Sequence, residues 1–215
     1  AHLDDDVVKG LVMFLYNTKT LQRLVLQTNY QEYDMIKAVA DALYDNTRIT
    51  HLTLKRGFSY VVSSCLPIIF ASGTHSAVTH LDVSEYPFST FVMHSLLTNL
   101  AHSRILHTLK LSVLVNVYSA FPHIAAFVAN TKSVKDLRVF AANKSRSVEF
   151  DIIDDIGEAM ASNTSITRLE LYIGVMSSVC FAPILTQNRV KQFLGRLLFL
   201  DDDYDEDAAL FVRNG

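Results

Sequence analysis

The chain has 215 residues, half of them apolar, and a formal net charge of −3 with an isoelectric point near 6.2. Its lysines and arginines are scattered, whereas a nucleic-acid-binding surface needs a basic stripe, so we expect no nucleic-acid partner. No apolar run approaches the about 18 residues that a membrane-spanning helix needs. The two cysteines, Cys65 and Cys180, lie far apart, which favours free thiols in a cytoplasmic protein over a disulfide framework.

A helix followed by a strand recurs along the chain. The clearest copy joins the end of a helix, residues 38–45, through Asn46 and Thr47 to a strand that ends at Leu54. Related segments occupy residues 14–26, 126–139 and 159–172, and two more divergent copies occupy residues 71–83 and 100–111. Such a repeat determines the architecture, because each unit can bury its apolar face only against its neighbours.

The predicted strands share the pattern Leu-x-x-Leu-x-Leu. Their first apolar positions, which are 28, 29, 28, 28 and 32 residues apart, are Leu21, Ile49, Val78, Leu106, Val134 and Ile166. The second position is leucine in all six copies: Leu24, Leu52, Leu81, Leu109, Leu137 and Leu169. The extra residues of the 32-residue unit lie in the polar segment 141–148, which we expect to protrude as a loop.

Helices are expected between these strands, where apolar residues recur with helical spacing. In chain order the sequence predicts a helix that ends at Tyr16, a strand over 23–27 and a helix over 33–45. The later helices are expected to start near Val61, Phe88, Ser119 and Asp151.

The last strand has two possible alignments. We prefer Leu194-x-x-Leu197-x-Phe199, which keeps a spacing of 28 residues from Ile166. The alternative, Val190-x-x-Phe193, would place Gly195 in the core. A short apolar helix over 208–213 would then cover the end of the core, as terminal repeats must.

This period and pattern resemble the ribonuclease-inhibitor type of leucine-rich repeat over roughly residues 10–200. The resemblance implies an α/β solenoid, or horseshoe, with a parallel β-sheet on the concave face, α-helices on the convex face and about 6–7 repeats. We therefore expect a single leucine-rich-repeat domain over 1–215. It would comprise an N-terminal partial repeat over 1–20, repeats over 21–193, and a C-terminal repeat and cap over 194–215.

The residues between the leucines are predicted to line the face of the sheet opposite the helices, because successive strand residues alternate. They form three rows across the repeats. The first row is Arg23, His51, His80, Thr108, Asp136 and Arg168. The second row is Val25, Thr53, Asp82, Lys110, Arg138 and Glu170. The third row is Gln27, Lys55, Ser84, Ser112, Phe140 and Tyr172.

The rows bring charged side chains of opposite sign together. Asp82 faces Lys110, Arg138 faces Glu170, and Asp136 faces Arg168. Exposed pairs of this kind contribute only about 0–1 kcal/mol each, so we expect them mainly to keep the face soluble.

The C-terminal half of this face is the predicted protein-binding site, because it displays arginines beside aromatic residues, the composition of interface hot spots. The predicted partner-binding residues are Lys110, Arg138, Phe140, Arg168, Glu170, Tyr172, His51 and His80. Alternatively, loop 141–148 folds over the aromatic pair. His51 beside His80 could bind a metal or sense pH, but two ligands without a carboxylate or thiol in their row favour a solvated pair and no metal.

Catalytic signatures are absent from the sequence. It contains no nucleophile elbow, phosphate-binding loop, zinc-protease motif or paired C-x-x-C. The acidic run 201–207 lacks the glycine and closing glutamate of a calcium loop. We therefore predict no catalytic residues, no cofactor and a non-enzymatic protein.

The predicted function is binding of a partner protein on the concave face. The resemblance to short leucine-rich-repeat proteins with divergent repeats also implies either a secreted bacterial effector, acting on a host protein in the host cytoplasm, or a protist protein. An alternative is the substrate-binding part of a GTPase-activating or ubiquitin-ligase component. A third is a structural homodimer through the apolar edge 194–200, so the chain is expected to be a monomer or weak dimer.

Overall fold

The computed structural model describes residues 5–27, 33–55, 70, 77–113, 117–141, 150–174 and 194–200. The strands in this part of the chain are β1 (Arg23–Leu26), β2 (His51–Leu54), β3 (His80–Phe88), β4 (Thr108–Val113), β5 (Asp136–Ala141), β6 (Arg168–Gly174) and β7 (Leu194–Leu200). The helices are α1 (Asp5–Asn17), α2 (Tyr33–Asp45), α4 (Thr90–Ala101), α5 (Val117–Asn130) and α6 (Phe150–Ser162).

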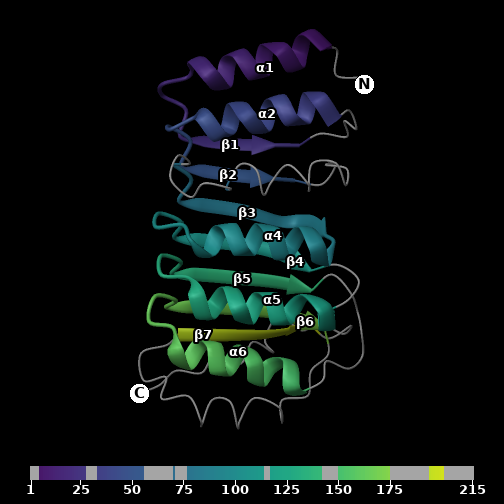
Figure 1. Ribbon diagram of the computed structural model, residues 1–215, viewed down its shortest axis with the longest axis vertical. Helices are drawn as coiled ribbons and strands as arrows, with labels where there is room; N and C mark the ends of the chain where they lie inside the picture. Colours follow the sequence, from purple (N-terminus) through teal and green to yellow (C-terminus); the bar gives the residue numbers. More distant parts are fainter. Residues whose placement is uncertain are drawn as a thin grey trace.

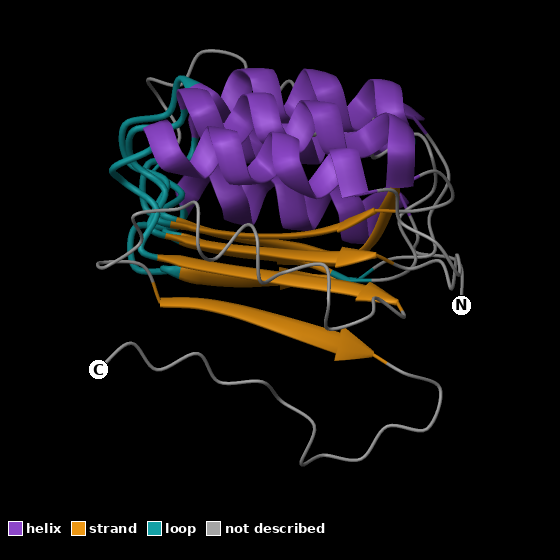
Figure 2. Cartoon of the chain, turned by 90° about the horizontal axis from the view of Figure 1, so that it is seen from below, coloured by secondary structure: helices purple, strands orange, loops and turns teal. Residues whose placement is uncertain are grey.

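The strands form one seven-stranded sheet in the order β1-β2-β3-β4-β5-β6-β7, and each strand pairs in parallel with the next one in the chain (Figure 1). The described helices all lie on one face of this sheet (Figure 2). The molecule is therefore an α/β protein with a helix-covered face and a face that no described helix covers, which we call the helix-free face. Among the described residues, no helix is long and apolar enough to span a bilayer.

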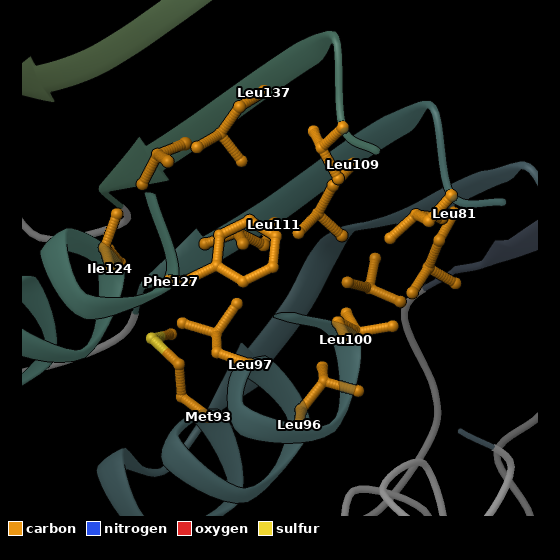
Figure 3. Close-up of a cluster of buried hydrophobic side chains, with 14 of the residues drawn as sticks. Leu81, Met93, Leu96, Leu97, Leu100, Leu109, Leu111, Ile124, Phe127 and Leu137 are labelled. Atoms are coloured by element: carbon orange, nitrogen blue, oxygen red, sulfur yellow. The ribbon is translucent and has the colours of Figure 1, made fainter. Parts of the chain in front are cut away.

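The core lies between the sheet and the helices, where leucines from alternate strand positions meet apolar helix residues (Figure 3). Leu109 and Leu137 from the strands and Phe127 from α5 are fully or almost fully buried. The α4 side of this cluster is made by Met93, Leu96, Leu97 and Leu100. The second-position leucines are in register from Leu24 on β1 to Leu169 on β6, as the sequence pattern predicts.

In most of the described turns between a helix and the next strand, one side chain accepts hydrogen bonds from backbone amides of the turn. This side chain, which closes the turn, belongs to the residue three positions before the first apolar residue of the strand. Asn46 is the best example: its side-chain oxygen accepts hydrogen bonds from the amides of Arg48 and Ile49, at 2.8 and 2.9 Å. Its side-chain nitrogen donates to the carbonyl of Leu15 at 2.6 Å. A buried asparagine thus ties one unit to the preceding one.

Asn163 makes equivalent hydrogen bonds in the turn between α6 and the next strand, but the asparagines of the other two Asn-Thr pairs do not. Asn17 and Asn130 lie four residues before their strand positions, and among the described residues their side chains bond to Met13 and Ala126 in their own helices. In those two turns the threonine occupies the closing position. Thr18 accepts a hydrogen bond from the Leu21 amide, whereas the buried Thr131 hydroxyl has no partner among the described residues.

Three details of the predicted elements differ in the structure. The helix expected near Phe88 begins at Thr90, because Phe88 ends β3 in the core and Ser89 caps the helix by accepting from the Val92 amide. Ser84 does not enter the third row: the register shifts after Val83, and Pro87 lies opposite Ser112. Proline has no amide hydrogen for a sheet ladder and commonly marks such an irregularity.

The third detail is the register of β7. The strand lies where the preferred alignment placed it, but Gly195 and not Leu197 is the neighbour of Leu169, and Leu197 pairs with Leu171. The shift is two residues, so it preserves the strand alternation on which the prediction depends. The predicted loop 141–148, the helix near Val61 and the helix over 208–213 lie outside the described residues, apart from Ala141, which ends β5.

Candidate functional site

The helix-free face carries the first two predicted rows in the predicted order. His51, His80 and Arg168 belong to the first row, and Lys110, Arg138 and Glu170 to the second. Adjacent parallel strands lie about 4.8 Å apart, so side chains in a row are near neighbours. The structure therefore brings the predicted site residues together in two groups, one on β2 and β3 and one on β4 to β6.

Glu170 is the centre of the second group. Only 1% of its surface is exposed, although it lies on the helix-free face. Arg138 reaches it from β5, with Nε 3.4 Å from Oε2, and Arg168 of its own strand binds Oε1 through Nε and Nη2. A buried carboxylate is stable only when paired and hydrogen-bonded, and here two guanidinium groups provide both.

Asp136 completes this charge network. Arg138 donates to both oxygens of Asp136, from Nε at 3.1 Å and from Nη2 at 2.9 Å. Asp136 and Arg168 are neighbours in register, as predicted, but they do not form an ion pair: Asp136 pairs with Arg138 and Arg168 with Glu170, each along its own strand. Residues i and i+2 of a strand share a face, so long side chains can pair along the strand as well as across it. We call Asp136, Arg138, Arg168 and Glu170 the arginine network.

Asp82 and Lys110 form a separate ion pair, as predicted, at 3.1 Å. Ser84 donates its hydroxyl and its amide to the same carboxylate, at 2.7 and 3.1 Å. Burial alone would raise the pKa of Asp82, but the hydrogen bonds from Ser84 and the Lys110 ammonium hold it below its ordinary value. This pair is about a third exposed and bounds the arginine network on the β3 side.

Phe140 is half-buried in the third row, between Ser112 of β4 and Tyr172 of β6 in register. It follows Arg138 by two residues and therefore emerges on the same face as the arginine network. The side chain of Tyr172 and the loop 141–148 lie outside the described residues, so the predicted aromatic pair is described only by its backbone register.

His51 and His80 stack face to face, with ring centroids 4.0 Å apart and an interplanar angle of 8°. Each ring places Nδ1 within 2.9 Å of the hydroxyl of the threonine before it, Thr50 or Thr79. Those hydroxyls donate their single hydrogen to the carbonyls of Gln22 and Thr50, so they must accept a hydrogen from Nδ1. Both neutral imidazoles are thereby fixed as the Nδ1–H tautomer, with Nε2 as the acceptor.

The environment of this pair disfavours its protonated form. Desolvation, followed by the Arg23 charge, lowers the pKa of His51. Desolvation also lowers the pKa of His80, with further contributions from His51, His107 and Arg23 that Asp136 partly opposes. Within the described residues, no cluster of three or more histidine, cysteine or acidic side chains could hold a metal ion.

We expect the two histidines to make the protein less stable in mild acid. Because their folded-state pKa lies below the unfolded value, the unfolded chain binds protons first as the pH falls through about 6.5, and the free energy of unfolding decreases. Urea denaturation of the wild type should therefore show a lower midpoint at about pH 5.5 than at about pH 7.5. The His51→Gln/His80→Gln variant should lose less stability over the same interval, and an identical loss in both proteins would contradict the assignment.

Sequence reasoning identified the rows but left Asp136 out of the predicted site. Its signal was present, because an aspartate two residues before an arginine on one strand shares its face. Burial of Glu170 was also missed, since the pattern treats every residue between the leucines as exposed.

Comparison with protein-family models gives no match, and neither does comparison with curated protein sequences. Among solved structures, the chain is similar to a tropomodulin C-terminal domain from Caenorhabditis elegans, with 13% identity, a TM-score of 0.45, and coverage of 84% of this chain and 92% of that one. It is also similar to leiomodin-1 actin-binding site 2, with 10% identity, a TM-score of 0.48, and coverage of 85% and 89%. Likenesses this weak assign no function to the chain.

Proposed function

We propose that this chain is a non-enzymatic, leucine-rich-repeat protein-binding module of the ribonuclease-inhibitor-like type, which binds a partner protein on the helix-free face of β4 to β6. In this proposal the sheet is the concave face of a solenoid and the helices its convex face. The repeat of 28 residues and the aligned second-position leucines of β1 to β6 support that architecture. A cytoplasmic location, in the protein's own cell or in a host, belongs to the same proposal.

The arginine network is the observation that carries the proposal. Its two guanidinium groups are held by a carboxylate that is itself almost completely buried, so their positions are fixed before any partner arrives. Fixing side chains in advance reduces the conformational entropy lost on binding. Arginine next to an aromatic residue on a rigid surface is also the composition of binding hot spots, and Phe140 supplies that aromatic residue.

The charges of the network suggest what it binds. Arg138 is shared between Asp136 and Glu170, whereas the side chain of Arg168 is 43% exposed and is the most accessible cation of the network. A carboxylate or a backbone carbonyl of the partner could accept a hydrogen bond there. We therefore expect a partner segment that combines an acceptor with an apolar side chain that packs on Phe140.

The test compares aromatic substitutions on the helix-free face with one in the helix layer. In affinity capture from a cell lysate, Phe140→Ala/Tyr172→Ala should recover at least several-fold less of a co-purifying protein than the wild type, since hot-spot truncations cost about 2 kcal/mol or more. The matched control is Phe91→Ala on α4, where Phe91 is 80% exposed and belongs to the helix layer.

Circular dichroism melts should show that all three proteins are folded. Loss of the partner in the Phe91→Ala variant alone would place the binding site on the helix layer and overturn the proposal. Equal recovery by all three proteins would equally exclude the face around Phe140. If the wild type captures no protein and elutes as a dimer from a sizing column, the homodimer alternative is favoured instead.

A further inference from the structure

A second histidine pair lies in the helix layer, away from the arginine network. His94 of α4 and His123 of α5 are 29 residues apart, one repeat, and so occupy matching places on adjacent helices (Figure 1). Their rings are tilted by 48° with centroids 4.5 Å apart, and their Nδ1 atoms face each other at 3.1 Å. The pair is exposed to solvent.

We propose that His94 and His123 form a binding site for a divalent transition-metal ion, with Zn²⁺ or Ni²⁺ as its ligand. Imidazole nitrogen suits these metals, which bind it in the neutral form. The site is separate from the proposed protein-binding face and does not depend on it.

The distance between the two nitrogens fits a chelated ion. With metal–nitrogen bonds of about 2.0–2.1 Å, a separation of 3.1 Å corresponds to a nitrogen–metal–nitrogen angle of about 100°. That angle lies between the square and tetrahedral values of about 90° and about 109°, so the separation of the two nitrogens is compatible with chelation of one ion. α4 packs beside α5, which brings the two ligand positions close together.

The stacked pair His51 and His80 provides the contrast. Its rings are nearly parallel, at 8°, so the nitrogen lone pairs of the two rings lie in two nearly parallel planes and do not converge on one point. Its Nδ1 atoms are also occupied by Thr50 and Thr79. The two histidine pairs of the repeat thus have the same residue types but different metal-binding geometry.

Water would complete the coordination sphere. Within the described residues no third histidine, cysteine or carboxylate joins the pair to form a larger cluster. A two-ligand site with open positions binds metal more weakly than a closed structural site of four protein ligands. Desolvation, followed by the neighbouring His94, lowers the pKa of His123, which favours the neutral form of that ring.

The test is a calorimetric titration of Zn²⁺, and separately of Ni²⁺, into the full chain in a buffer that does not chelate metals. We expect binding that weakens at least tenfold in His94→Gln and in His123→Gln, and that persists in the control His51→Gln/His80→Gln. An ion that bridges two helices of the folded state also stabilises it by mass action, so the melting temperature should rise with metal in the wild type and the control only.

Three results would overturn the proposal. They are absence of binding to the wild type, binding that survives both His94→Gln and His123→Gln, and binding that is lost in the His51→Gln/His80→Gln control. Because glutamine keeps the size and polarity of these exposed or half-buried side chains, and melts without metal report folding, a failed fold is distinguished from a lost site.

Discussion

Replacing Asn163 by alanine is expected to lower the free energy of unfolding by about 2–4 kcal/mol, whereas the same change at Asn130 should alter it by about 0.5 kcal/mol or less. Both residues belong to an Asn-Thr pair at the end of a helix, so the sequence alone would rank them as equals. The structure separates them by what their side chains join.

Asn163 makes four hydrogen bonds to backbone groups of two units. Its nitrogen donates to the carbonyls of Val128 and Thr131 at 2.7 and 2.8 Å, and its oxygen accepts from the amides of Ser165 and Ile166 at 2.8 Å each. Alanine would leave these partly buried groups without that partner, and an unsatisfied buried group costs about 1–3 kcal/mol. Asn130 makes one exposed bond, to Ala126 within its own helix, and water can replace it.

Urea denaturation of the two variants and the wild type measures the difference directly. A common slope against urea concentration would show that the change lies in stability and not in the extent of unfolding. Equal midpoints for Asn163→Ala and Asn130→Ala would show that the turn asparagines do not tie neighbouring units together.

Replacing Glu170 by alanine is expected to cost about 2–3 kcal/mol of unfolding free energy, below the about 3–5 kcal/mol typical of breaking a fully buried ion pair. The cost arises because Arg138 and Arg168 would face each other without the carboxylate between them. It is moderated because their side chains are 24% and 43% exposed and can regain water.

The matched control is Asp82→Ala, which removes a carboxylate from the same row of the same face. Its partner Lys110 is 32% exposed and Asp82 itself is 27% exposed, so this loss should cost about 1 kcal/mol or less. Thermal or urea denaturation of both variants gives the comparison. A Glu170→Ala variant as stable as Asp82→Ala would show that burial of Glu170 adds nothing to its pairing.

The Glu170→Ala variant also tests whether Glu170 acts by positioning the two arginines and not by touching the partner itself. Glu170 is too buried to make much contact with a partner, yet its loss frees both guanidinium groups. If the arginine network binds a partner as proposed, recovery of that partner should fall in a variant whose exposed surface is almost unchanged.

The sequence was sufficient for the strands and the rows because one leucine pattern recurs at nearly constant spacing. Leu24, Leu52 and Leu81 are neighbours in the sheet as their alignment predicts. The residues that alternate with these leucines are therefore neighbours as well. A slip of one residue would move the leucines of a strand to the other face of the sheet, so burial of the leucines excludes that register.

Other structural details could not be predicted from the leucine pattern, each for a physical reason. The register of β7 was wrong by two residues, and a shift of two preserves the alternation on which the prediction depends. The departure of Ser84 from its row reflects a local irregularity before Pro87. The pairing of Asp136 with Arg138 depends on side-chain reach along a strand, which residue spacing does not specify.

Pairing of each strand only with the next one in the chain has a consequence for folding kinetics. The sheet contacts connect residues about one repeat apart, such as Arg23 with His51 and Asp136 with Arg168, and none must wait for the two ends of the chain to meet. Short loop closures of this kind favour rapid folding. Where each described strand pairs with the next one in the chain, folding can begin in one unit and spread to the next. We expect folding to start at α5 and its neighbouring strands, where Phe121 and Phe127 are completely buried, and to reach the edge strands β1 and β7 last.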